Sequence, residues 1–164
     1  MKLAEALAAR ADLQRRIEQL RTRIAGNARY QEGEEPAEDA AALLAEASRA
    51  LDELQQLIRR INATNARVLL DGEGTMTDAL AARDVLRLRH ALLTDAAAAA
   101  SGSSEHGAAW GLRQMRSELR QFPALPVAQL RADADDVSRR LRELDGRIQQ
   151  ANWNNDLEED GGSR

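Results

Sequence analysis

Cysteine is absent from this 164-residue chain, and aromatic residues make up only 2% of it. Without cysteine, the chain has no disulfide framework, no thiolate metal ligand and no catalytic thiol. Its two tryptophans, one tyrosine and one phenylalanine offer few surfaces on which bases, sugars or flat cofactors could stack. Leu, Ile, Val and Ala must therefore build the core, and such side chains favour closely packed helices.

An excess of positive charge is also missing, since 23 Lys and Arg stand against 27 Asp and Glu. The averaged surface therefore does not favour phosphates or anionic lipid, and we expect no nucleic-acid partner. The most apolar window, residues 91–100, contains Asp95 and is far shorter than the ~20 residues that a membrane span needs. With no visible secretory signal, we expect a cytoplasmic protein without a membrane partner.

Motifs for metal or catalytic chemistry are absent as well. Neither histidine has Glu three positions before it, as a di-iron helix motif requires. The loop that begins at Asp71 fails as a calcium loop, because Met76 and Ala82 stand where glycine and glutamate are needed. No phosphate loop or nucleophile elbow can be found. We therefore expect no metal, no cofactor and no catalytic residue.

Two heptad seams dominate what is present. The first seam consists of Leu44, Ala47, Leu51, Leu54, Ile58, Ile61 and Asn65, and the second of Val127, Leu130, Ala134, Val137, Leu141, Leu144, Ile148 and Ala151. Steps of three and four keep each set on one stripe of a helix, which needs a partner helix to cover it. Trp153 ends the second seam, either as a hydrophobic plug or as an anchor in a subunit contact.

The spacing predicts a mainly all-α fold, an elongated antiparallel bundle or coiled coil of about four helices. The helices are expected over residues 2–29, 38–67, 75–100 and 126–151, within one domain that covers residues 1–155. An acidic, disordered tail is expected over 156–164. The apolar face of the third helix is expected to carry Ala81, Val85, Leu88 and Leu92. Residues 101–126 fit a short helix, an extended arm or a strand.

Five polar residues form the one alternative site, a polar pocket for a ligand or a reaction. Asn62 and Asn65 lie near the end of one helix, and His90 lies near Asp84 and Arg87 on the next. A helical histidine beside a carboxylate could transfer a proton. The structural interpretation is that Asn65 fixes helix register and that His90 is a half-exposed helix residue.

Four segments resemble the small bacterial proteins known as septicolysin-like. They are Asn27–Pro36, Arg60–Asn65, Thr77–Leu86, and Leu141–Asp145 with Ala151–Trp153. The resemblance implies a helical protein with a cytolysin name, no assigned mechanism and no catalytic residues to carry over. It also favours a short β-arm near 112–122, where the pattern within this chain favours a helix.

The sequence thus specifies an architecture more than an activity. We expect a non-enzymatic, self-assembling helical protein that forms a homo-oligomer, because the narrow seams need a second chain to cover them. A membrane-active protein and a ligand-binding protein or enzyme are the alternatives. No small-molecule partner can be named from these residues.

Overall fold

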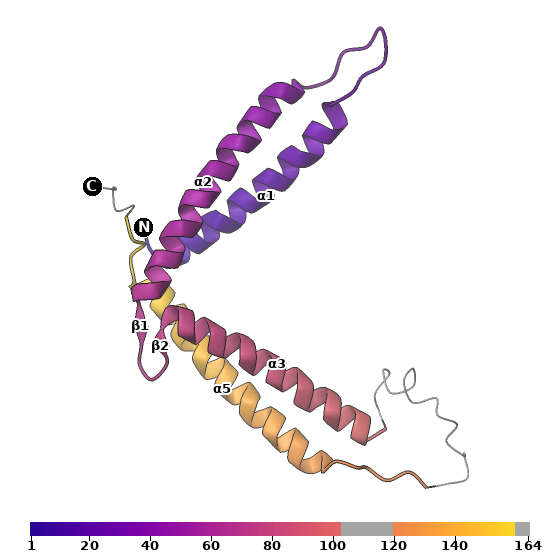
Figure 1. Ribbon diagram of the computed structural model, residues 1–164, viewed down its shortest axis with the longest axis vertical. Helices are drawn as coiled ribbons and strands as arrows, with labels where there is room; N and C mark the ends of the chain where they lie inside the picture. Colours follow the sequence, from indigo (N-terminus) through magenta and orange to yellow (C-terminus); the bar gives the residue numbers. More distant parts are fainter. Residues whose placement is uncertain (103–119, 160–164) are drawn as a thin grey trace. The chain divides into compact units, whose positions relative to one another are not determined.

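The computed structural model describes residues 1–102 and 120–159 and is mainly helical (Figure 1). Its helices are α1 (Leu3–Asn27), α2 (Ala40–Arg67), α3 (Met76–Ala100) and α5 (Val127–Asn154). Two short strands, β1 (Leu69–Leu70) and β2 (Gly74–Thr75), pair with each other. The predicted all-α class is confirmed.

Contacts divide the chain into two compact units, and the single domain over 1–155 stays a prediction. The first unit contains Met1–Leu69 together with Gln149–Arg164, and the second contains Leu70–Ile148. Each unit includes two helices side by side, α1 with α2 and α3 with the greater part of α5 (Figure 1). Helix α5 is continuous across the boundary, so its last residues belong to the first unit.

The first unit is built on the antiparallel pair of α1 and α2. Helix α1 buries Leu3, Ala6, Leu13 and Leu20. Helix α2 buries Leu43, Ala47, Ala50, Leu57, Ile61 and Thr64. Steps of three, four or seven separate these positions on each helix, so each set forms a single stripe.

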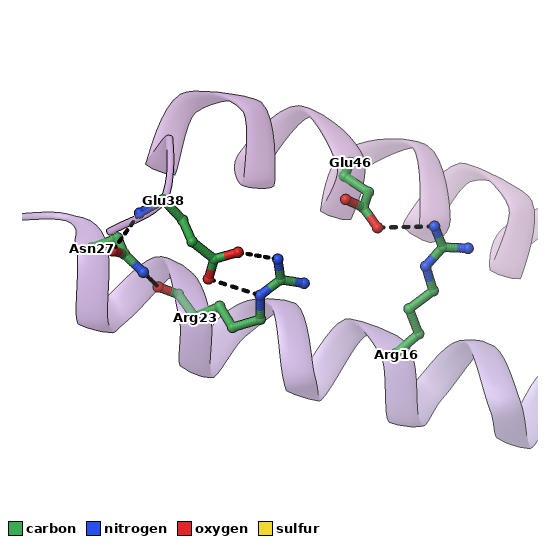
Figure 2. A network of polar contacts seen from close by, with 5 residues as sticks. All are labelled: Arg16, Arg23, Asn27, Glu38 and Glu46. Atoms are coloured by element: carbon green, nitrogen blue, oxygen red, sulfur yellow. Dashed lines mark hydrogen bonds and ion pairs between the residues drawn. The ribbon is translucent and has the colours of Figure 1, made fainter. Parts of the chain in front are cut away.

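Polar contacts fix the end of this hairpin where α1 passes into α2 (Figure 2). Arg23 donates from Nε to Glu38 Oε2 at 3.0 Å, and its Nη2 pairs with the other carboxylate oxygen. Asn27 accepts the backbone N–H of Glu38 at 3.0 Å and donates to the carbonyl of Arg23 at 2.9 Å. Asp39 then caps α2 by accepting from the N–H groups of Ala41 and Ala42. The acidic residues Glu38 and Asp39 therefore close the hairpin and start α2.

The second unit pairs α3 with α5. Ion pairs set the antiparallel register, because Arg87 lies 3.6 Å from Asp145 and Arg147 lies 2.7 Å from Glu73. The buried residues are Leu70, Met76, Ala79, Ala97, Ala134, Val137, Leu144 and Ile148. Both helices thus contribute buried apolar side chains to this unit.

The turn before α3 is held by reciprocal hydrogen bonds between Thr75 and Asp78. Thr75 caps the helix by accepting from the N–H of Asp78 at 3.2 Å, and the Asp78 carboxylate accepts from the Thr75 backbone N–H at 2.9 Å. The Thr75 hydroxyl also donates to Asp78 Oδ2 at 2.6 Å, and this hydrogen bond, together with the one from the Thr75 backbone N–H, lowers the pKa of the Asp78 carboxyl. Gly74 has a φ of +82°, and a Cβ there would lie 2.8 Å from Asp78 Oδ2. Glycine is needed at this position for both reasons.

The first residues after α5 contact the N-terminus, since Leu157 is buried and donates its backbone N–H to the Met1 carbonyl at 2.8 Å. The disordered tail over 156–164 stays a prediction. Residues 160–164 lie outside the described part of the chain. Most of the predicted β-arm near 112–122 also lies outside it, and residues 120–122 are not in a strand.

Candidate functional site: two exposed apolar stripes

Helix α2 has apolar side chains on two adjoining faces, of which α1 covers only one. Leu43 is 6% exposed, whereas its neighbour Leu44 is 58% exposed. Leu51 is also exposed, and Ile58, one heptad further along, is half-buried. The predicted seam and the observed inner face have Ala47, Leu54 and Ile61 in common. Every other residue of the predicted seam comes one position after a residue of the inner face and therefore lies further around the helix.

A stripe without charge follows this second face of α2. We call it the α2 stripe, and it consists of Ala41, Leu44, Ser48, Leu51, Gln55, Ile58, Asn62 and Asn65. Its members step by three and four along the whole helix, so they stay on one line. Charged residues make up 30% of the chain, so an exposed line of helix residues without any charge stands out from the rest of the surface and is a candidate interaction site.

Helix α3 carries a second exposed stripe. Val85, Leu88 and Leu92 are 54%, 72% and 69% exposed, and Ala81 precedes them on the same line. We call these four residues the α3 stripe. The sequence predicted that this face would be the apolar face of the helix, but α5 covers the other side, where Leu86, His90 and Leu93 are half-buried. The α3 stripe therefore faces solvent.

The C-terminal seam differs from both stripes because none of its members is exposed. Its central residues Val137 and Leu144 are buried, as is Ile148. Leu130 and Leu141 are half-buried. Trp153, which follows the seam, is exposed, and the buried residues near it are Asn152 and Leu157. Trp153 therefore does not act as a plug within the chain.

The five polar residues of the alternative site lie on different helices in different units. Asn62 and Asn65 are on α2, exposed and half-buried respectively. On α3, Arg87 lies 3.7 Å from Asp84 and also pairs with Asp145, while His90 is half-buried. Arg87 thus pairs with Asp84 along the helix and with Asp145 of α5, while the Asp84 side chain stays 63% exposed.

A groove of about 510 Å³ lies in the first unit between α1 and α2. Its wall combines charged side chains of both signs, which include Asp12, Arg16 and Glu53, with the buried Leu13 and Leu57. Arg16 also pairs with Glu46 at 2.9 Å, so it holds the two helices together (Figure 2). None of the five residues of the alternative site lines this groove.

Sequence reasoning missed a polar cluster that holds the C-terminal segment. Thr64 accepts the backbone N–H of Glu158 at 2.9 Å, and Arg60 donates to the Glu158 carbonyl at 2.8 Å. Lys2 adds an ion pair to Asp156 at 3.0 Å. The only signal in the sequence was the charge complementarity between Arg60 and an acidic tail, which is too general to specify a contact.

Among the described residues, no helix is both long enough and apolar enough to cross a membrane. Over the same part of the chain, no three His, Asp or Glu side chains gather as a metal site would require.

Comparisons with known proteins place the chain in a family without assigning an activity. No curated protein is similar enough to count as a match. A crystal structure of a functionally unknown conserved protein from Corynebacterium diphtheriae is similar with a TM-score of 0.86 and 34% sequence identity, over 96% of this chain and 99% of that one. The resemblance to septicolysin-like proteins stays a prediction. Residues 10–157 match the model of a family of unknown function, DUF6847, and the chain belongs to that family.

Proposed function

We propose that this protein is a non-enzymatic helical interaction protein that associates with copies of itself through the α2 and α3 stripes. The observation that supports the proposal is the set of large apolar side chains that face solvent along one line of each of two helices. Contiguous exposed apolar surface of this kind marks interaction sites in soluble proteins. The cytoplasmic location expected from the sequence remains part of the proposal.

Physical chemistry favours a second helix as the group that covers these stripes. Each stripe is narrow, straight and flanked by polar residues, which is the shape that another helix fits. Covering apolar surface contributes roughly 25 cal/mol per Å², so several leucines at one contact are needed to offset the cost of association. Both stripes place more than one leucine along a single line of a helix, where one partner helix can cover them together.

Size-exclusion chromatography with light scattering tests the proposal. The wild-type chain of 18.0 kDa should elute with a mass that is a multiple of this value and that falls on dilution. Replacing Leu44 and Leu51 by Gln, or Leu88 and Leu92 by Gln, should lower the mass at a given concentration. Both pairs are exposed, so the single chain should keep its helical content.

A matched control uses exposed alanines of α2 that lie off the stripe, Ala45→Gln with Ala63→Gln. This control adds the same polar group without removing apolar surface, and its mass should equal that of the wild type. A wild-type chain that stays at 18.0 kDa at every concentration would overturn the proposal.

A further inference from the structure

We propose that the α3 stripe pairs with the α3 stripe of a second copy, with the two helices parallel and in register. This inference rests on the proposed self-association and adds its site, its direction and its charge contacts. The α3 stripe is the more exposed of the two stripes, since both of its leucines have more than two thirds of their surface free.

The angular positions on α3 fit the interface of a two-stranded coiled coil. At about 100° per residue, Val85, Leu88 and Leu92 fall within about 60° of one another around the helix. Val85 and Leu92 are one heptad apart and correspond to the a position, and Leu88 then corresponds to d. In a parallel coiled coil, a β-branched residue at a, such as Val85, with leucine at d favours two strands over three or four.

The charges beside the stripe select the direction of the pair. Asp84 and Arg89 lie about 70° to either side of the centre of the stripe, which makes them the g and e positions. In a parallel pair, a g residue lies opposite the e residue five positions later in the other chain. Asp84 of each copy would therefore meet Arg89 of the other, and the symmetric dimer contains this contact twice.

An antiparallel pair would leave both charges without partners. With Val85 opposite Leu88 of the second copy, Asp84 would face Ala91 and Arg89 would face Ala82. The parallel arrangement is therefore the one with charge complementarity.

The contacts within the chain leave these charges available. Arg89 is exposed and has no ion pair or hydrogen bond with any residue of the described ranges 1–102 and 120–159. Asp84 lies 3.2 Å from Arg83 and 3.7 Å from Arg87, and its side chain is still 63% exposed. Asp84 can thus accept a further cation without breaking the core of the second unit.

The length of the stripe limits the contact to the central part of α3. Asp78 at the start of the helix is engaged with Thr75, and Asp95 places a carboxylate on the line after Leu92. Like charges at Asp95 would meet in a parallel pair, so the two helices must separate there. The contact therefore extends from Ala81 to Leu92.

Single cysteines test the arrangement cleanly because the chain has no cysteine of its own. In the full-length protein, Leu88→Cys and Val85→Cys should each form a disulfide-linked dimer on mild oxidation, since equivalent residues face each other in a parallel pair. Thr94→Cys is the control, because Thr94 is exposed about 150° around the helix from the stripe and should not cross-link.

Charge reversal gives a second measurement. Arg89→Glu should weaken the dimer on the order of tenfold in Kd, since two attractive contacts become repulsive, and adding Asp84→Lys should restore most of the loss.

The outcomes separate this inference from the proposed function. Self-association by light scattering with no cross-link at residue 85 or 88 would overturn the α3 pairing and leave the proposed function standing. Cross-links that appear only when the two cysteine variants are mixed would show an antiparallel pair, and equal cross-linking at residue 94 would show a contact that is not confined to the stripe. Either result overturns the inference, whereas a wild-type monomer overturns both proposals.

Discussion

Two neighbouring leucines on α2 provide the sharpest test of how its two faces differ. Leu43 lies on the face that α1 covers, and Leu44 begins the α2 stripe. The substitutions Leu43→Ala and Leu44→Ala remove the same atoms from adjacent positions of one helix. Any difference in their effect therefore reports on burial and not on residue type or helix propensity.

The structure gives an expected magnitude for each substitution. Removing a buried leucine side chain costs about 2–5 kcal/mol of unfolding free energy, and a pair of helices with open sides can collapse around the gap, so we expect about 2–3 kcal/mol for Leu43→Ala. Leu44 is 58% exposed and loses less than half of that transfer energy. The higher helix propensity of alanine offsets a further ~0.2 kcal/mol, so Leu44→Ala should cost less than about 1 kcal/mol.

Urea unfolding followed by circular dichroism measures both values at a protein concentration low enough to keep the chain monomeric. Light scattering at higher concentration should then show the opposite order, with Leu44→Ala weakening association and Leu43→Ala acting only through the fold. Equal unfolding costs, or a larger cost for Leu44→Ala, would refute the assignment of inner and outer faces on α2.

Four further substitutions test local features of the fold. The hydrogen bond from Arg23 lowers the pKa of Glu38. The contact therefore stabilises the hairpin fully above the unfolded-state pKa of about 4.3, and this stabilisation is lost as the pH falls through the lower folded-state pKa. Glu38→Gln should abolish this pH dependence, which amide exchange near the loop measures. Gly74→Ala should destabilise the protein by about 1–2 kcal/mol in thermal unfolding, while Gly26→Ala, which has open space around it, should stabilise α1 by about 0.5–1 kcal/mol. Thr64→Val removes the acceptor for the backbone of the C-terminal segment and should speed proteolysis after residue 154, and an unchanged cleavage rate would contradict the role of this contact.

The helices could be predicted from the sequence because their boundaries have local chemical causes. Asp39 and Thr75 cap the helices that follow them, and Pro126 immediately precedes α5. The seam on α5 was also predictable, since α5 has a single apolar line and polar residues elsewhere. Val137 and Leu144 on that line are buried.

The packing faces of α2 and α3 could not be chosen from the sequence. Leu43 and Leu44 are adjacent and chemically identical, so two heptad lines one residue apart fit α2 equally well. On α3, the line through Leu86 and Leu93 competes with the line through Leu88 and Leu92. Only the position of the partner helix decides which line is covered, and that position is a long-range property.

The contacts of residues 157 and 158 could not be predicted for a different reason. An acidic, glycine-ending tail has the composition of a disordered segment. One apolar residue, Leu157, and two backbone hydrogen bonds from residues 157 and 158 are enough to hold its first part against the first unit. Composition averages over such single contacts and cannot reveal them.

Sedimentation equilibrium over a wide range of protein concentrations tests the central claim most directly, because it measures mass without a surface or a matrix. The stripes predict a mass that rises from 18.0 kDa at high dilution to at least twice that value, and a much weaker rise when Leu44, Leu51, Leu88 and Leu92 are all replaced by Gln. A mass of 18.0 kDa for the wild-type chain at every concentration would contradict the claim that these exposed residues join copies of the protein.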